Sequence, residues 1–265
     1  MKIAVTGKGG TGKTFVAGSL ATWFARRGRP VIAIDADPSP NLGVSLGLSS
    51  EETSNVLPVA ENEELVRLKT GTEYSGVFRL TFTVDDIIRK FAVRTPAGPS
   101  LLVMGTVRAV GSGCTCPAHA VVKALLRHLI VERDEVVILD MDAGIEHLGR
   151  GTAEHVDVLL VVTDANRKSL EVAKTICRLA KDSRIPKAGL VGNRVASDRD
   201  AGAIRSFAAG NGMPVFCLIP FDRDVFESGI TGSRPDEQNS AAIREIAVLG
   251  ATLGSGPATG TDPRE

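Results

Sequence analysis

Short apolar runs alternate with longer amphipathic stretches along this chain, a pattern typical of strands and helices in alternation. Most of the runs are apolar at every position, so both faces of the resulting sheet should be covered. The pattern therefore predicts an α/β fold in one domain, a mostly parallel twisted sheet flanked by helices on both faces. The predicted strands are Lys2 to Thr6, Val31 to Ile34, Leu101 to Met104, Val136 to Leu139, Val158 to Val162, Gly189 to Val191 and Val215 to Ile219.

Three stretches between these runs have helical spacing of their apolar residues. One helix is predicted from about Gly12 to Arg27, a second after Pro117, and a third through Leu170 to Ala180. The stretch from about residue 51 to residue 100 interrupts the alternation. Beyond Gly250 the chain is rich in Gly, Thr and Pro without apolar periodicity. We therefore expect one domain over residues 1–250 and a disordered tail over residues 251–265.

Composition and charge narrow the class of protein. The 265 residues are 43% hydrophobic and 23% charged, which is typical of a globular chain. Lys and Arg together number 31, and so do Asp and Glu, which gives a net charge of zero. The chain therefore has no excess of positive charge that would favour binding to nucleic acid or to an anionic membrane. No apolar run approaches the roughly 18 residues of a spanning helix, and the start of the chain does not resemble a signal peptide. We expect a cytoplasmic protein with neither nucleic acid nor membrane as partner.

The first strand leads into a phosphate-binding loop. The segment matches G-x-x-x-x-G-K-S/T between an apolar strand and an amphipathic helix, the context that this motif requires. Backbone N–H groups and the helix N-terminus would surround the phosphates of ATP. Lys13 should contact the β- and γ-phosphates, and the Thr14 hydroxyl should ligate Mg²⁺. The nucleotide-binding residues expected here are Gly7, Lys8, Gly9, Gly10, Thr11, Gly12, Lys13, Thr14 and Phe15.

Lys8 is an additional basic residue on the outer edge of this loop. The loop resembles the deviant phosphate loop of the family that holds nitrogenase iron proteins, the arsenite and tail-anchored-protein ATPases, and the MinD and ParA ATPases. The resemblance implies that Lys8 crosses a dimer interface and contacts the partner's nucleotide. It therefore implies a homodimer promoted by nucleotide, with Lys8 and Lys13 both acting in catalysis.

Carboxylates follow two of the predicted strands, at the edge where ligands bind in open α/β sheets. Asp35 and Asp37 follow one strand, and Asp140 follows another. An acid after an apolar strand commonly holds Mg²⁺ in phosphate-loop enzymes. The family resemblance implies that Asp37 positions or activates the attacking water and that Asp35 supports the metal site. A plain turn at Asp37-Pro38 is the alternative.

The segment after Asp140 resembles the second switch of the same family. Gly144 offers a backbone N–H without a side chain in the way, suited to sensing a γ-phosphate, and hydrolysis should release this segment. Glu146, His147 and Arg150 follow it. For these three the choice between partner contacts and ordinary surface stays open.

The adenine contacts are expected near the last two predicted strands. Asn193 resembles the adenine-reading asparagine of the family, because an amide can both donate to and accept from one base edge. Pro220 matches the position at which family members contact the base.

Cys114 and Cys116 lie two residues apart in a glycine-rich turn before a predicted helix. Such a position favours thiolate, but two thiolates do not complete the four-ligand sites of Zn²⁺ or square-planar Ni²⁺. A two-fold dimer would supply four. Burial as small hydrophobic side chains is the alternative, and Cys177 and Cys217 fit it.

With the dimer-type lysine, the chain from Met1 to about Gly250 resembles the CooC-type ATPases that mature nickel carbon monoxide dehydrogenase. This resemblance implies a Ni²⁺ or Zn²⁺ site of four thiolates across the dimer. The predicted function is a dimeric ATP-hydrolysing metallochaperone that inserts nickel into carbon monoxide dehydrogenase or a related client metalloenzyme. An ATP-dependent reductase like the nitrogenase iron protein, and a MinD/ParA-type positioning ATPase, are the alternatives.

Overall fold

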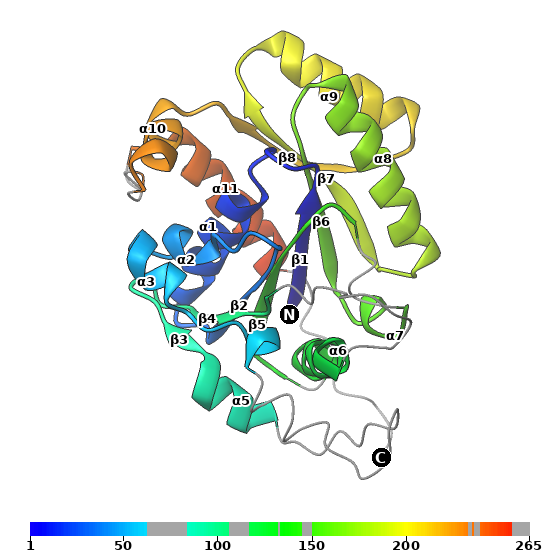
Figure 1. The fold of residues 1–265 in the computed structure, drawn as a ribbon. Coiled ribbons are helices and arrows are strands. Elements are labelled where there is room, and N and C mark those ends of the chain that lie inside the picture. Colours follow the sequence, from blue (N-terminus) through cyan, green and yellow to red (C-terminus); the bar gives the residue numbers. More distant parts are fainter. Residues whose placement is uncertain are drawn as a thin grey trace.

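The computed structural model describes residues 1–62, 84–105, 117–131, 133–144, 150–232, 235 and 239–255. Eight strands form one sheet in the order β3-β4-β2-β5-β1-β6-β7-β8, and every neighbouring pair is parallel except β3 with β4 (Figure 1). This arrangement confirms the predicted α/β fold. The strands are β1 (Lys2–Gly7), β2 (Val31–Ala36), β3 (Val93–Arg94), β4 (Ser100–Val103), β5 (Val136–Met141), β6 (Val158–Thr163), β7 (Lys187–Val195) and β8 (Val215–Pro220).

Helices cover both faces of this sheet, which explains why its central strands are apolar at most positions. All six residues of β1, of β5 and of β6 are buried. One face packs against α1 and α11, and the other against α6, α8 and α9 (Figure 1). The helices are α1 (Lys13–Ala25), α2 (Leu42–Ser45), α3 (Ser50–Ser54), the 3₁₀ turn η1 (Val59–Glu61), α5 (Val84–Phe91), α6 (Pro117–Val131), α7 (Arg150–Ala153), α8 (Arg167–Asp182), α9 (Asp198–Gly210), α10 (Arg223–Thr231) and α11 (Ala241–Gly254).

The end of α11 differs from the prediction of a disordered tail beginning at residue 251. The helix continues to Gly254, and the buried residues Ile246 and Leu249 hold it against α1. A Cβ atom on Gly250 would lie 2.8 Å from two ring atoms of Trp23, so the glycine lets the two helices approach closely. The prediction was therefore wrong for residues 251–254, because a contact with a distant helix extends α11. Residues 256–265 lie outside the described residues.

The short edge strand β3 was not predicted. It has two residues, Val93 and Arg94, which pair antiparallel with Leu101 and Ser100 of β4. A pair of residues is too short to form the apolar run on which strand prediction depends. Among the helices that the structure describes, none is long and apolar enough to cross a membrane.

Candidate nucleotide-binding site

The phosphate loop leaves the sheet at the carboxyl end of β1 and enters α1. Gly7 lies so close to β6 that a Cβ atom would come within 2.1 Å of the Val162 carbonyl oxygen. Gly10 and Gly12 have φ values of +83° and +92°, a region that glycine adopts without strain. Gly12 is the N-cap of α1 and has no side chain to bond the first amides of the helix. This arrangement presents backbone donors and the helix N-terminus to an anion.

Two further contacts hold the loop in shape. The carbonyl oxygen of Lys8 accepts hydrogen bonds from the N–H of Thr11 at 3.2 Å and from the Thr11 hydroxyl at 2.8 Å. The Nδ2 of Asn193, at the end of β7, donates to the carbonyl oxygen of Thr11 at 2.8 Å. Asn193 is buried, so this hydrogen bond forms in a protected environment. The amide predicted to read adenine therefore supports the phosphate loop in this structure.

The two loop lysines differ in exposure. Lys13, at the first position of α1, is 6% exposed. Lys8 is half-buried, and within the described part of the chain no hydrogen bond or ion pair engages its ammonium group. Lys13 is therefore buried at the start of α1, near enough to Asp140 to lower its pKa, whereas no described residue engages the ammonium group of Lys8.

Asp35 and Asp140 are cross-strand partners on β2 and β5, and both are fully buried. The Asp35 carboxylate accepts hydrogen bonds from the N–H groups of Leu42 at 2.9 Å and Asp37 at 3.2 Å. Burial raises the pKa of Asp35 to about 6 despite these donors. Its two oxygens thus fasten the chain that leads into α2, which agrees with a supporting role.

Asp140 differs because, among the described residues, neither of its carboxylate oxygens accepts a hydrogen bond of normal geometry, although the Thr14 hydroxyl lies near enough to lower its pKa. Burial raises its pKa to about 7, and the negative charge of Asp35 adds to the increase, while Thr14 and Lys13 lower it. A buried carboxylate without a partner is costly unless it is neutralised. The hard oxygen donors of Asp140 and Thr14 match the ligand preference of Mg²⁺. These residues therefore fit the predicted metal.

Asp37 lies further out and is half-buried. Its Oδ1 accepts a hydrogen bond from the N–H of Ser39 at 2.9 Å, so the side chain stabilises the turn that the alternative interpretation expected. Its role toward an attacking water stays a prediction.

Gly144 does not offer the open N–H that the sequence suggested. Its N–H donates to the hydroxyl of Thr6 at 3.1 Å, and its φ value is +131°. The N–H is therefore engaged in this structure, and its role in sensing a γ-phosphate stays a prediction. Glu146 and His147 lie outside the described residues, and of Arg150 only the backbone, at the start of α7, is described.

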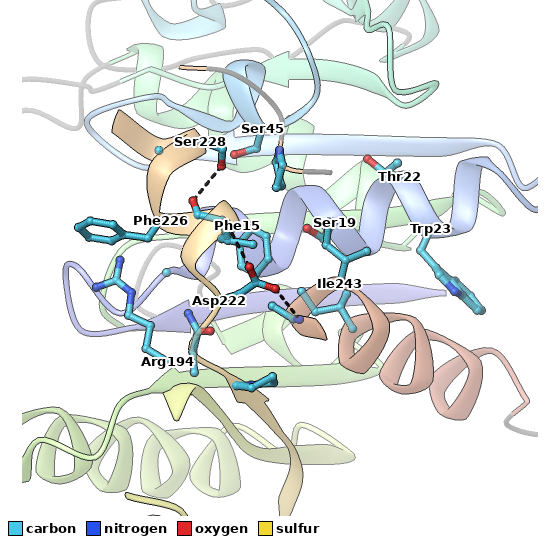
Figure 2. A pocket seen from close by; sticks show the side chains of 18 of the residues that line it. Phe15, Ser19, Thr22, Trp23, Ser45, Arg194, Asp222, Phe226, Ser228 and Ile243 are labelled. Carbon is cyan, nitrogen blue, oxygen red and sulfur yellow. Dashed lines mark hydrogen bonds between the residues drawn. The ribbon is translucent and has the colours of Figure 1, made fainter. Parts of the chain in front are cut away.

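A cavity of about 600 Å³ extends from the phosphate loop between α1, α10 and α11 (Figure 2). Gly12, Phe15, Asn193 and Pro220 line its end beside the loop. The far end is lined by Trp23, at the other end of α1. The structure thus brings the predicted adenine contacts to one cavity next to the phosphate loop, and their role in base recognition stays a prediction.

Asp222 organises the rim of this cavity and is not among the site residues predicted from the sequence. One carboxylate oxygen accepts hydrogen bonds from the N–H groups of Asp224 and Val225 at the start of α10. The other accepts from the Ser240 hydroxyl at 2.7 Å and from the Ala242 N–H at 3.2 Å at the start of α11. An aspartate just before a helix is a recognisable N-cap signal. The hydrogen bonds of Asp222 to the start of α11, later in the chain, have no comparable signal in the sequence.

The cysteines divide into two groups. Cys114 and Cys116 lie outside the described residues, and the described residues contain no cluster of three or more metal-ligating side chains. Burial raises the pKa of the Cys177 thiol to about 11 and that of the Cys217 thiol to about 12. Both therefore stay protonated, as expected of cysteines that pack as small hydrophobic side chains.

Comparisons with known proteins agree with this site. The model of the CbiA family, described as the CobQ/CobB/MinD/ParA nucleotide-binding domain, matches residues 2–235. The carbon monoxide dehydrogenase accessory protein CooC of Rhodospirillum rubrum is 46% identical over 227 residues, covering 85% of each chain. An uncharacterised ATP-binding protein of Methanocaldococcus jannaschii is 40% identical over 253 residues, covering 94% of this chain and 96% of its own.

Solved structures share the fold at lower identity. A ParA family ATPase from Chlorobium tepidum TLS superposes with a TM-score of 0.69 at 20% identity, covering 95% of this chain and 98% of its own. MinD of Pyrococcus horikoshii, solved in complex with Mg-ADP, gives a TM-score of 0.67 at 20% identity, covering 96% and 95%. With the phosphate loop in place, the relatives confirm the predicted ATPase class. The chain therefore belongs to the CobQ/CobB/MinD/ParA family of nucleotide-binding domains, and its similarity to CooC confirms the resemblance that its motifs had indicated.

Proposed function

We propose that this protein is a dimeric ATPase that takes part in the maturation of carbon monoxide dehydrogenase or a related nickel metalloenzyme. The observation that carries the ATPase part of the proposal is the buried Asp140 carboxylate, which accepts no backbone hydrogen bond among the described residues and lies at the strand end beside the phosphate loop. The identity of 46% to CooC supports the choice of client.

The chain's own residues supply most of what ATP hydrolysis requires. Backbone N–H groups of the loop and the helix N-terminus bind the phosphates, and buried Lys13 adds a positive charge where negative charge develops during transfer. Asp140 and Thr14 would hold Mg²⁺, which neutralises the phosphate oxygens when it is bound. Asp37, half-buried at the edge of the site, is the candidate to orient the attacking water.

Lys8 supplies the reason to expect a dimer. No described group of its own chain engages its ammonium, whereas its carbonyl oxygen accepts hydrogen bonds from Thr11 within the loop. In the proposed dimer each Lys8 contacts the partner's triphosphate. This contact would form only when nucleotide is present, so nucleotide would promote dimerisation.

Two loop variants separate hydrolysis from dimerisation. We expect Lys13→Ala to abolish ATP turnover, and Lys8→Ala to lose nucleotide-driven dimerisation while it keeps most of the ATP affinity. Sedimentation with a non-hydrolysable ATP analogue measures the second effect. Lys174→Ala, on the exposed surface of α8, is the control and should dimerise normally. Normal dimerisation of Lys8→Ala would contradict the proposed role of Lys8.

The metal cargo is proposed to bind at Cys114 and Cys116 of both subunits, because two thiolates from each chain complete a four-ligand site. The test is the metal content of the purified protein with and without ATP. We expect about one nickel or zinc per two chains, lost in the Cys114→Ser/Cys116→Ser variant. The Cys177→Ser/Cys217→Ser variant also removes two thiols but should keep the metal. One tightly held ion per monomer would defeat the bridging site.

A further inference from the structure

Thr6 lies at the point where the phosphate loop and the chain after Asp140 meet. Thr6 is the last residue but one of β1, directly before Gly7, and its side chain is fully buried. The neighbouring strand β5 ends at Met141, and the chain then passes through Asp142 to Gly144 beside Thr6. One hydroxyl group therefore connects the phosphate-loop strand to the described part of the segment that resembles the second switch.

The distances define how this hydroxyl is used. The Oγ1 of Thr6 lies 2.7 Å from the carbonyl oxygen of Asp142, and 3.1 Å from both the backbone nitrogen and the carbonyl oxygen of Gly144. A hydroxyl has one proton to donate and can accept through its lone pairs. The shortest contact takes the proton, so Thr6 donates to Asp142 and accepts the N–H of Gly144.

The amide just before Gly144, that of Ala143, is also engaged in a hydrogen bond. Asp142 Oδ1 accepts the N–H of Ala143 at 2.7 Å. The backbone of Gly144 has a φ value of +131°, which side-chain-bearing residues rarely adopt. The backbone donors of residues 143 and 144 are thus both satisfied within the chain. An anion can take the N–H of Gly144 only if the hydrogen bond to Thr6 breaks.

We propose that Thr6 is a positioning residue that holds Gly144 in a resting position, and that a γ-phosphate must displace this contact to bind the Gly144 N–H. This inference rests on the proposed ATPase function and says how the protein sets its affinity for ATP relative to that for ADP. A diphosphate has no γ-phosphate to bind the Gly144 N–H, so the hydrogen bond between Gly144 and Thr6 stays intact. Thr6 therefore lowers the affinity for the triphosphate relative to the diphosphate.

The test compares two nucleotides in three proteins. Calorimetry measures the affinity for Mg-ADP and for the Mg²⁺ complex of a non-hydrolysable ATP analogue. Thr6→Val keeps the shape of the side chain and removes the hydroxyl. We expect its affinity for the analogue, relative to that for ADP, to rise about fivefold, the effect of losing one net hydrogen bond. Thr6→Ser restores the hydroxyl and should restore the wild-type ratio.

Thr163→Val is the matched control. Thr163 ends the neighbouring strand β6, is fully buried, and donates to the carbonyl oxygen of Asp164 at 3.1 Å. Its loss should leave the ratio unchanged. The proposal would be overturned if Thr6→Val changed the affinities for Mg-ADP and for the ATP analogue equally, or shifted their ratio toward ADP. A merely structural role of Thr6 would change both affinities by the same factor.

A measurement without nucleotide examines the same contact. Hydrogen exchange of the Gly144 amide in the nucleotide-free protein should be at least about fivefold faster in Thr6→Val than in wild type, and slow again in Thr6→Ser. An unchanged exchange rate in Thr6→Val would refute the resting contact. Failure of the wild type to bind or hydrolyse ATP would instead refute the proposed function. Normal hydrolysis with an unchanged affinity ratio in Thr6→Val would refute only the role of Thr6.

Discussion

The buried Asp140 carboxylate should cost the metal-free protein stability, and Asp140→Asn removes that cost. Asparagine has nearly the same shape as a protonated aspartic acid and never ionises. Burial raises the pKa of Asp140 from 3.8 to about 7. Each unit by which the pKa is raised corresponds to about 1.4 kcal/mol. Ionised Asp140 therefore lowers the free energy of unfolding by about 4 kcal/mol.

The direction of the pH dependence follows from the same pKa. Between about pH 4 and pH 7 the folded protein keeps the Asp140 proton that the unfolded chain has lost. The stability that this proton contributes is fully present below about pH 4 and is lost as the pH rises to about 7. Asp140→Asn should therefore be more stable than wild type by about 4 kcal/mol at pH 8, by about 2 kcal/mol at pH 5, and equal to it near pH 4.

Urea unfolding in the presence of EDTA measures this difference, since EDTA removes any bound divalent metal. Asp182→Asn, an exposed position at the end of α8, is the control and should change stability by less than about 0.5 kcal/mol at every pH. An Asp140→Asn protein that is no more stable than wild type at pH 8 would refute the reasoning. The same variant should lose Mg²⁺-dependent ATP hydrolysis, so the residue that destabilises the empty site would be required for its activity.

Three other substitutions, one of them a control, test two contacts around the site. Gly250→Ala should lower the free energy of unfolding by about 1–3 kcal/mol in urea, because its Cβ would lie 2.8 Å from the Trp23 ring. Gly202→Ala, in α9 with no atom within 4 Å of the added Cβ, should instead raise it by about 0.5–1 kcal/mol, and a loss there would contradict the comparison. Asn193→Ala removes the hydrogen bond to the Thr11 carbonyl oxygen and should weaken Mg-ADP binding about tenfold in calorimetry, whereas unchanged affinity would show that the loop does not need this support.

The main strands and the phosphate loop could be predicted because their signals are local. A strand that is buried on both faces is apolar over most of its length, so the run from Val158 to Val162 can be recognised without any knowledge of its neighbours. The loop motif needs only a strand before it and a helix after it. The meeting of Asp35 and Asp140 could also be expected, since parallel strands place their carboxyl ends at one edge of the sheet.

Contacts between distant parts of the chain could not be predicted in this way. Thr6 reaches Gly144 across 138 positions, and Asn193 reaches Thr11 across 182. Neither pair has a sequence pattern that names its partner, because a hydrogen bond depends on where two backbones pass in space. The end of α11 shows the same limit, since Gly250 and residues 251–254 resemble a tail until the contact with α1 is known.

By itself, the sequence determined the α/β class, the phosphate loop and the acidic strand ends, because each depends on the chemistry of neighbouring residues. Only the tertiary structure decided which backbone N–H groups are already hydrogen-bonded and which of the two acids accepts no backbone hydrogen bond. Asp35 and Asp140 look alike in sequence, yet one is bonded by backbone N–H groups and the other has no described partner. The reason is physical: the cost of a buried charge is set by the atoms around it, and folding brings those atoms from distant segments.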